Sequence, residues 1–257
     1  MPIIKVEALR KVYVQTISSA KVVAIDNLTF NINEHEVVSI VGQTGCGKST
    51  FLNILMGLEQ PTSGKLEVDG KEPYKDFNSL KGKIGIVFQQ DRLLPWRRAI
   101  DNTKIGLEVL GYTPEEQIKR ASEWLTRLGL ANFLNAYPSE LSGGMRQRVA
   151  LARALCIDPK IILLDEAFGH LDEVTASKLR KDFLELVHST KKTAVFVTHQ
   201  LDEAIEIGNR IIVFGKPAKV LADIKVEPSF KDDQSKIQRL RQEIQQILDK
   251  NQPIGLE

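Results

Sequence analysis

Gly42-Gln43-Thr44-Gly45-Cys46-Gly47-Lys48-Ser49 is the stretch that decides the fold, because it fits the phosphate-binding pattern G-x-x-x-x-G-K-[S/T]. Glycines let successive backbone N–H groups converge on phosphate oxygens, and a helix that follows offers its N-terminal dipole to the same anion. Lys48 would place a cation on the β- and γ-phosphates, and the Ser49 hydroxyl would complete a Mg²⁺ shell. The pattern predicts a nucleotide site.

The sequence on either side supplies the context that this pattern requires. Val37–Val41 is an apolar run typical of a buried strand, and Ser49–Met56 has the composition of a helix. The alternative interpretation, a flexible glycine loop, does not call for a strand before it and a helix after it. We therefore expect a strand-loop-helix unit.

Composition narrows the class of protein. The chain has 257 residues, 42% hydrophobic and 26% charged, which is ordinary for a globular protein, and we expect one compact unit with two lobes. A net charge of +2 without a long basic block gives no indication of nucleic acid. The two cysteines, Cys46 and Cys156, favour a reducing cytosol. No apolar run approaches the roughly 20 residues that span a bilayer, so a membrane role would have to come from another subunit.

Alternating strand and helix signals predict an α/β fold with a mainly parallel sheet. Short β-rich runs from residue 3 to about 40 indicate an antiparallel β-layer, and a helical lobe at about 91–158 would be inserted in the core. A first domain would cover 1–230, and a helical tail 231–257, with its helix at Asp232–Lys250 docked by one apolar face. The strands expected after the loop are Lys65–Val68, Ile84–Phe88, Lys160–Leu164, Thr193–Thr198 and Arg210–Phe214, and the helices are Ala99–Leu110, Pro114–Leu128, Gly143–Ala154, Glu173–His188 and Leu201–Ile207.

Two further motifs identify a family. Leu141-Ser142-Gly143-Gly144-Met145 comes first, and the apolar run Ile161–Leu164 then ends in Asp165-Glu166. With Gln89 before them and His199 after them, the chain resembles the ATP-binding subunits of ATP-binding-cassette (ABC) transporters over roughly residues 3 to 220. The resemblance implies the fold of P-loop NTPases.

The resemblance also implies how ATP is bound. Two subunits would hold two ATP molecules head to tail, so that each phosphate loop faces the Ser142–Gly144 segment of the other subunit. By itself that segment could equally be a helix N-cap with flexible glycines, and Tyr13, the candidate to stack on adenine, could be a tyrosine of the β-layer. The residues implied to hold ATP are Tyr13, Gly42, Gln43, Thr44, Gly45, Cys46, Gly47, Lys48, Ser49, Thr50, Ser142, Gly143, Gly144 and Asp172.

Catalytic roles follow from the same resemblance. Glu166 would be the general base, Gln89 would reach the attacking water, and His199 would contact the γ-phosphate. Asp165, Ser49 and Gln89 would hold Mg²⁺. Three alternatives stay open from the residues alone: an acidic surface pair at 165–166, Gln90 in the role of its neighbour, and a structural histidine.

Three positions depart from the family pattern. Proline is usual where Ala167 stands, a small residue where His170 stands, and aspartate where Gln200 stands. None of these changes removes a catalytic group. They leave open how stiff the turn after Glu166 is.

The segment Gln89–Arg97 looks like its counterpart in the ATPase subunits of nitrate, sulfonate and taurine importers. This implies transmembrane permease subunits as partners, a second ATPase subunit (the same chain or a close paralogue), an extracytoplasmic solute-binding protein indirectly, and a place at the cytoplasmic face of the membrane. Trp96 and Leu93-Leu94 could either receive the permease or be packed in the helical lobe. The alternative function is a soluble ATP-dependent clamp acting on nucleic acid or ribosomes.

Overall fold

The computed structural model describes residues 1–14, 20–227 and 233–251. The chain divides into two compact units. The first unit joins Met1–Leu80 to Val195–Glu257, and the second is Lys81–Ala194. The boundary between them falls inside one strand, β7 (Thr193–Thr198).

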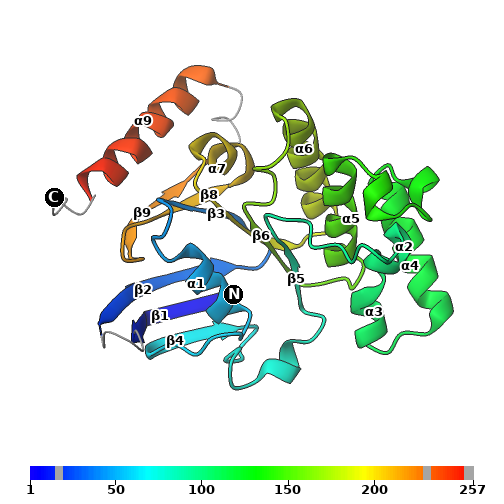
Figure 1. The fold of residues 1–257 in the computed structure, drawn as a ribbon. Helices are drawn as coiled ribbons and strands as arrows, with labels where there is room; N and C mark the ends of the chain where they lie inside the picture. The colour runs from blue at the N-terminus through cyan, green and yellow to red at the C-terminus, as the bar shows by residue number, and fades with distance from the viewer. Residues whose placement is uncertain (15–19, 228–232, 252–257) are drawn as a thin grey trace. The chain divides into compact units, whose positions relative to one another are not determined.

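An antiparallel sheet forms one layer of the first unit (Figure 1). Its strands are β1 (Pro2–Val14), β2 (Lys21–Asn33) and β4 (Ser63–Val68), in the order β2-β1-β4. The predicted β-layer is confirmed. Strand β2 is continuous through Asn27, which has a φ of 52°.

The phosphate-loop strand lies in a second, mainly parallel sheet. All six residues of β3 (Val37–Gly42) are buried, and β3 pairs in parallel with β8 (Arg210–Phe214). A strand that the sequence did not indicate, β9 (Val220–Lys225), pairs antiparallel with β8. Helix α1 (Lys48–Leu55) follows the loop, and the short helices η1 (Phe77–Leu80) and α7 (Leu201–Ile207) complete this part of the first unit.

Aromatic packing holds α1 in place. The ring of Phe51 lies 5.5 Å from that of Phe30 and 5.9 Å from that of Phe214, measured between centroids. All three side chains are buried. Because these residues come from α1, β2 and β8, the helix that starts at the phosphate loop is anchored to both sheets of its unit.

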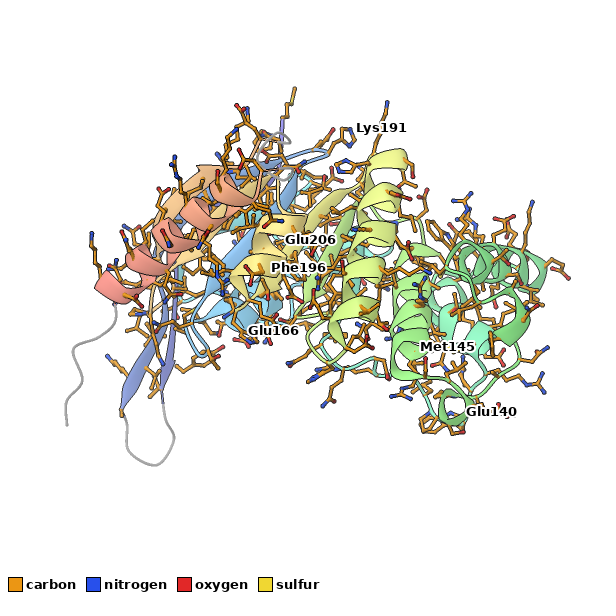
Figure 2. The ribbon with its side chains drawn as sticks, turned by 90° about the horizontal axis from the view of Figure 1, so that it is seen from above. Glu140, Met145, Glu166, Lys191, Phe196 and Glu206 are labelled. Carbon is orange, nitrogen blue, oxygen red and sulfur yellow. The ribbon has the colours of Figure 1, made fainter. Side chains whose placement is uncertain are left out.

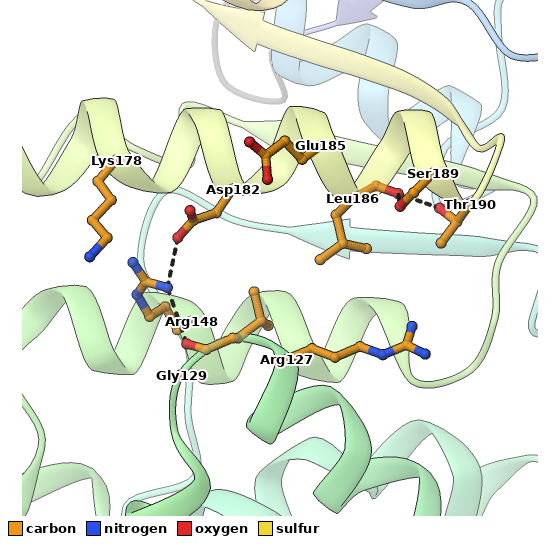
Figure 3. A pocket seen from close by; sticks show the side chains of 10 residues that line it. Arg127, Gly129, Arg148, Lys178, Asp182, Glu185, Leu186, Ser189 and Thr190 are labelled. Carbon is orange, nitrogen blue, oxygen red and sulfur yellow. Dashed lines mark hydrogen bonds and ion pairs between the residues drawn. The ribbon is translucent and has the colours of Figure 1, made fainter.

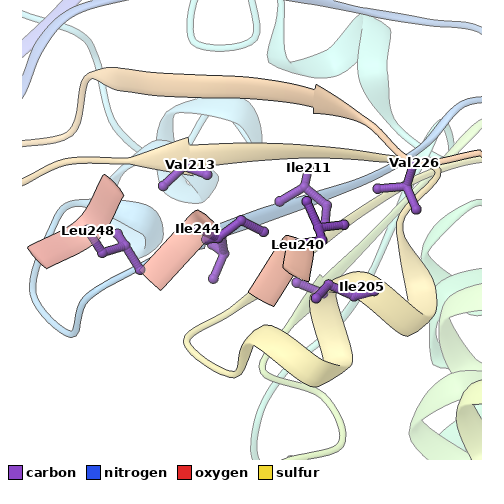
Figure 4. Packing of buried hydrophobic residues seen from close by; sticks show 9 residues of the cluster. Ile205, Ile211, Val213, Val226, Leu240, Ile244 and Leu248 are labelled. Atoms are coloured by element: carbon purple, nitrogen blue, oxygen red, sulfur yellow. The ribbon is translucent and has the colours of Figure 1, made fainter. Parts of the chain in front are cut away.

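Helix α9 (Gln234–Lys250) packs through one face (Figure 4). Leu240, Ile244 and Leu248 are buried against Ile205 of α7 and against β8. The spacing of these side chains is the helical repeat of an amphipathic helix. The helix is capped at Asp233, whose side chain accepts from two backbone N–H groups; residue 232, the predicted start, lies outside the described residues.

The second unit contains a further parallel strand pair and most of the helices. Strand β5 (Ile84–Val87) pairs with β6 (Ile161–Asp165). Helix α4 starts with a capping box formed by Thr113 and Glu116. The helices of this unit are α2 (Ala99–Thr103), α3 (Ile105–Val109), α4 (Pro114–Arg127), η2 (Ala131–Phe133), η3 (Pro138–Glu140), α5 (Gly143–Leu155) and α6 (Glu173–Ser189).

One helix prediction was wrong. The stretch expected as a single helix, 99–110, forms two short helices separated at Lys104. The Thr103 carbonyl accepts from the Cys156 thiol at 3.0 Å, and Gly106 packs so closely that a Cβ there would lie 2.6 Å from Ile157. These contacts with the chain after α5 favour the break. Elsewhere the α/β fold with its parallel sheet is confirmed.

No helix within residues 1–14, 20–227 and 233–251 combines the length and the apolar composition needed to cross a bilayer.

Candidate functional site

Close backbone packing explains the glycines at both ends of the phosphate loop. Gly47 has a φ of 113°, and a Cβ added there would lie 2.3 Å from the carbonyl oxygen of Ala24. A Cβ on Gly42 would lie 2.8 Å from both the Cys46 sulfur and the Phe214 carbonyl oxygen. Side chains at either position would therefore displace the loop.

Lys48 fills the interior of this loop. Its side chain is buried, and Nζ donates to the carbonyl oxygens of Gly42 at 2.6 Å and Gln43 at 3.0 Å. The ammonium group is thus held where the loop turns back, at the N-terminus of α1. A loop of backbone amides, a helix N-terminus and a fixed cation together fit a bound polyphosphate.

Two groups near the loop bear on its chemistry. Cys46 is 1% exposed, and burial raises the pKa of its thiol, so the loop carries no reactive thiolate at neutral pH. Lys216, which belongs to no motif in the sequence, has its Nζ 3.5 Å from the position that a Cβ on Gly45 would take. It follows β8 and is distant in the sequence, so no motif could reveal it.

Tyr13 lies beside the first turn of α1. Its hydroxyl donates to Glu59 at 2.5 Å and lies 3.4 Å from the Thr50 hydroxyl, while Lys11 Nζ sits 5.0 Å from the ring centroid. Burial raises the pKa of the Tyr13 hydroxyl. Tyr13 is 37% exposed, which is compatible with stacking on a base, and the adenine contact stays a prediction.

His199 is exposed directly after β7, in the same unit as the phosphate loop. Both residues next to it in the chain, Thr198 and Gln200, form hydrogen bonds. The Thr198 hydroxyl donates to the buried Glu203 carboxylate at 2.8 Å and accepts from the N–H of Gln200 at 3.0 Å. The backbone around the histidine is therefore fixed by α7.

In the second unit, the ends of two parallel strands bring a glutamine and a carboxylate together. Gln89 follows β5 and Glu166 follows β6; the Gln89 amide donates to Glu166 Oε2 at 3.1 Å. Glu166, labelled in Figure 2, has a φ of 47°, a left-handed conformation that is uncommon outside glycine. Asp165 is the last residue of β6. Of the two candidate glutamines, it is Gln89 whose side chain contacts this carboxylate.

The Ser-Gly-Gly segment forms the start of α5. The Ser142 hydroxyl accepts from the N–H of Met145 at 3.3 Å, and Figure 2 shows Met145 in the first turn of this helix. Gly143 and Gly144 supply the first amides of the helix, which have no carbonyl partner one turn earlier in it. The capping role of Ser142 is therefore present, and the contact with a second subunit's ATP stays a prediction.

Asp172 has a similar local role. Its carboxylate caps α6 by accepting from the N–H of Thr175 at 3.0 Å, and this hydrogen bond lowers the pKa of Asp172. The same Thr175 lies next to Gly144: a Cβ on that glycine would be 2.6 Å from Thr175 Cγ2. The starts of α5 and α6 are thus in close contact.

This packing leads to a prediction that separates folding from function. Gly144→Ala should lower the free energy of unfolding by about 1–3 kcal/mol, because the new methyl overlaps Thr175. Gly143→Ala should leave stability unchanged or slightly higher, since its Cβ would meet nothing closer than 3.8 Å. Thermal melting of both variants checks this, and Thr175→Ser, which removes Cγ2, should restore the stability of Gly144→Ala.

If the amides of this turn receive a partner's ATP, Gly143→Ala should nevertheless lose ATP-dependent dimerisation. A folded Gly143→Ala variant that dimerises normally would exclude that role.

A cavity of about 440 Å³ lies beside the catalytic candidates of the second unit. Gln89, Gly143, Gln147, Ala167 and His170 are among its lining residues. A larger groove of about 900 Å³ lies elsewhere in the unit and includes none of the predicted site residues. There, as Figure 3 shows, Arg148 pairs with Asp182 at 2.9 Å and donates to the Leu128 carbonyl at 3.1 Å.

No three His, Cys, Asp or Glu side chains in the described part of the chain converge as metal ligands. A hydroxyl such as that of Ser49, together with phosphate oxygens, is a donor set that suits Mg²⁺.

The predicted residues thus form two groups, one in each unit. The phosphate loop, Tyr13 and His199 belong to the first unit, and Gln89, Asp165, Glu166, the Ser142–Gly144 segment and Asp172 belong to the second.

Comparison with known proteins bears on the family. The family model described as "ABC transporter" matches residues 25–169. An uncharacterised ABC transporter ATP-binding protein of Methanocaldococcus jannaschii, MJ0412, is 39% identical over 95% of this chain and 91% of its own length. The taurine import ATP-binding protein TauB of Rhizobium johnstonii is 37% identical, over 88% of each chain.

A solved structure gives the same result. The ATP-binding cassette MJ0796, in a dimeric post-hydrolysis state bound to ADP and phosphate, matches with a TM-score of 0.77 and 38% identity, over 87% of this chain and 99% of that one. The ABC resemblance that the motifs indicated is confirmed. This chain belongs to the ABC transporter family, and it is one of the ATP-binding, ATP-hydrolysing subunits of that family.

Proposed function

We propose that this chain powers a membrane importer for a small solute such as taurine, another sulfonate or nitrate, with Glu166 as the general base of ATP hydrolysis. The observation that carries the catalytic part is the hydrogen bond of 3.1 Å between Gln89 and Glu166. It joins the two side chains that are proposed to act on the attacking water. The importer part is supported by the likeness to TauB over most of both chains.

In the proposed site, the phosphate loop holds the triphosphate of ATP. Lys48 is oriented by its two carbonyl contacts. Ser49, in the first turn of α1, would offer its hydroxyl to Mg²⁺, and Asp165 and Gln89 are the other proposed ligands of that ion. When bound, Mg²⁺ neutralises charge on the phosphate oxygens. Tyr13 would stack on the adenine.

Proton transfer is assigned to the second unit. The Glu166 carboxylate accepts a proton from the attacking water. The Gln89 amide, which already donates to that carboxylate, orients the carboxylate. His199 contacts the γ-phosphate from the end of β7. General-base catalysis of this kind contributes roughly 10²- to 10⁴-fold to a rate.

Two copies of the chain, or one copy and a paralogue, would form the working unit. Ser142, Gly143 and Gly144 would contact the ATP on the opposite subunit, with Asp172 nearby. Closure around ATP and opening after hydrolysis would then drive permease subunits at the cytoplasmic face of the membrane, with a solute-binding protein acting on the other side.

Exposure supports a docking role for one part of the segment after Gln89. Trp96 is 72% exposed, whereas Leu93 is buried. The alternative of core packing therefore holds for Leu93 and not for Trp96. An exposed tryptophan is typical of a contact with another protein.

Co-purification tests the proposal against the clamp alternative. The tagged full chain, isolated from detergent-solubilised cells of its own source, should bring down apolar membrane subunits, and the complex should hydrolyse Mg-ATP. Trp96→Ala should weaken this association, while Phe133→Ala, at a second exposed aromatic of the same unit, serves as the matched control. Recovery with ribosomes or DNA in place of membrane subunits would contradict the importer function.

A further inference from the structure

One buried side-chain amide in the second unit takes part in a closed ring of hydrogen bonds that includes Gln89 and Glu166. Gln147, on α5, is 5% exposed. Its Nε2 donates to the carbonyl oxygen of Ala167 at 2.6 Å and to that of Phe88 at 3.3 Å. Phe88 directly precedes Gln89, and Ala167 directly follows Glu166. The Gln89–Glu166 hydrogen bond completes the ring.

The donors of the Gln147 amide match in number the carbonyl acceptors around it. A side-chain amide nitrogen carries two N–H donors, and here each has one carbonyl acceptor. Because the Gln147 side chain is buried, a side chain without these donors would leave the carbonyl groups of Ala167 and Phe88 without the partner that they have here. The contact therefore ties the ends of β5 and β6 to one point on α5.

Glu166 is the member of the ring whose conformation most needs support. Its φ of 47° is costly for a side chain with a Cβ, and the turn that follows carries Ala167 where family members usually have proline. Within the turn, Gly169 N–H donates to the Glu166 carbonyl at 3.2 Å. The hydrogen bond from Gln147 holds the carbonyl group of the next residue, Ala167. It therefore limits backbone rotation at Ala167, the position at which a proline would fix φ.

Other contacts from α5 hold the segment that follows Gln89. Arg146 Nε donates to the Asp91 carboxylate at 2.9 Å, and Arg153 donates to the carbonyl oxygens of Asp91 at 2.6 Å and Arg92 at 2.8 Å. These contacts restrain residues 91–92. Gln147 instead joins the carbonyl of Phe88, the residue before Gln89, to that of Ala167 in the turn after Glu166.

We infer that Gln147 is a positioning residue for ATP hydrolysis, which holds the backbones of Gln89 and Glu166 in the register at which their side chains meet. The inference rests on the proposed role of Glu166. It assigns Gln147 no contact with ATP or with the attacking water. Its loss should therefore act on turnover through Glu166 and leave nucleotide affinity, which depends on the phosphate loop, nearly unchanged.

The test compares Gln147→Met with wild type in the full chain purified with its membrane subunits. Methionine keeps the length and volume of the side chain and removes both donors. Steady-state hydrolysis of Mg-ATP should show kcat lowered by roughly 10- to 100-fold, since small displacements of a catalytic group have effects of this order, with KM for ATP within about threefold. Gln117→Met is the matched control, because Gln117 also donates to a carbonyl, that of Tyr112 at 2.7 Å, and lies on α4; it should behave like wild type.

A second variant supplies a readout that loss of stability would not produce. Gln147→Glu places a carboxyl group against two carbonyl oxygens, and burial raises the pKa of such a group. Below that pKa the carboxylic acid regains one O–H donor. The ratio of its kcat to that of wild type should therefore rise as the pH falls from 8 to 6, whereas the ratio for Gln147→Met should stay flat.

The Glu166→Gln background separates this inference from the proposed function. If Gln147 acts through Glu166, adding Gln147→Met to Glu166→Gln should cause little further loss in single-turnover hydrolysis. Wild-type kcat in Gln147→Met, an equal loss in Gln117→Met, or multiplied losses in the double variant would each overturn the inference. Wild-type hydrolysis by Glu166→Gln would instead contradict the proposed function, whatever Gln147→Met does.

Discussion

Glu166→Gln should lower the kcat for ATP hydrolysis by roughly 10²- to 10⁴-fold, because the amide cannot accept the proton of the attacking water. The substitution preserves the shape of the side chain, and its amide oxygen can still accept from Gln89, which lies 3.1 Å away in the wild-type protein. Binding of Mg-ATP should persist. Phosphate release measured under saturating Mg-ATP checks the loss.

The same variant should reveal the proposed ATP-dependent dimer. If hydrolysis opens the dimer, Glu166→Gln should accumulate as a dimer with Mg-ATP and stay a monomer without nucleotide, as measured by size-exclusion light scattering. Glu185→Gln, on α6 at the larger groove, is the control and should keep wild-type turnover. Normal hydrolysis by Glu166→Gln would remove Glu166 as the general base. A persistent monomer would mean that the dimer needs its membrane subunits or that the Ser142 segment does not contact ATP.

Lys48→Met should weaken ATP binding by roughly 100-fold. Hydrogen bonds to charged groups contribute about 1.5–3 kcal/mol each, and the lost ammonium group is the cation that the loop holds in place. Its two carbonyl contacts, to Gly42 and Gln43, also disappear, so the loop loses its internal support. Isothermal titration with ATP in the presence of Mg²⁺ measures the change.

Lys216→Met provides the comparison for this prediction. That side chain is exposed and lies beside Gly45 at the rim of the loop, so its charge is screened by solvent. Its loss should change ATP affinity by only about threefold. ATP affinity in Lys48→Met that stays within that same range, with an unchanged melting temperature, would show that the loop does not bind the triphosphate as proposed.

The local elements were largely predictable from the sequence. The phosphate loop between β3 and α1, the capping box of α4 and the N-cap at Ser142 each depend on residues a few positions apart, whose geometry is set by backbone sterics and local hydrogen bonds. The helix break at Lys104 was not, because it depends on contacts of Thr103 and Gly106 with the chain after α5.

The partners of individual side chains were decided by tertiary structure. The sequence placed Gln89 and Glu166 at strand ends, but their contact exists because β5 and β6 are parallel neighbours. It left Trp96 and Leu93 with the same two interpretations, and only burial distinguished them. Lys216 beside the loop carried no motif at all.

By itself, the sequence determined the family, the nucleotide-binding loop and the residue types of the catalytic set, because the chemistry of holding phosphate restricts which residues can occupy those positions. The tertiary structure alone decided which groups hold that set in place. Gln147 lies far from Gln89 and Glu166 along the chain, and it reaches both segments because α5 packs its amide against the ends of two strands. A hydrogen bond to a backbone carbonyl does not restrict the side chain of the residue that accepts it. The identities of Phe88 and Ala167 therefore do not indicate this contact.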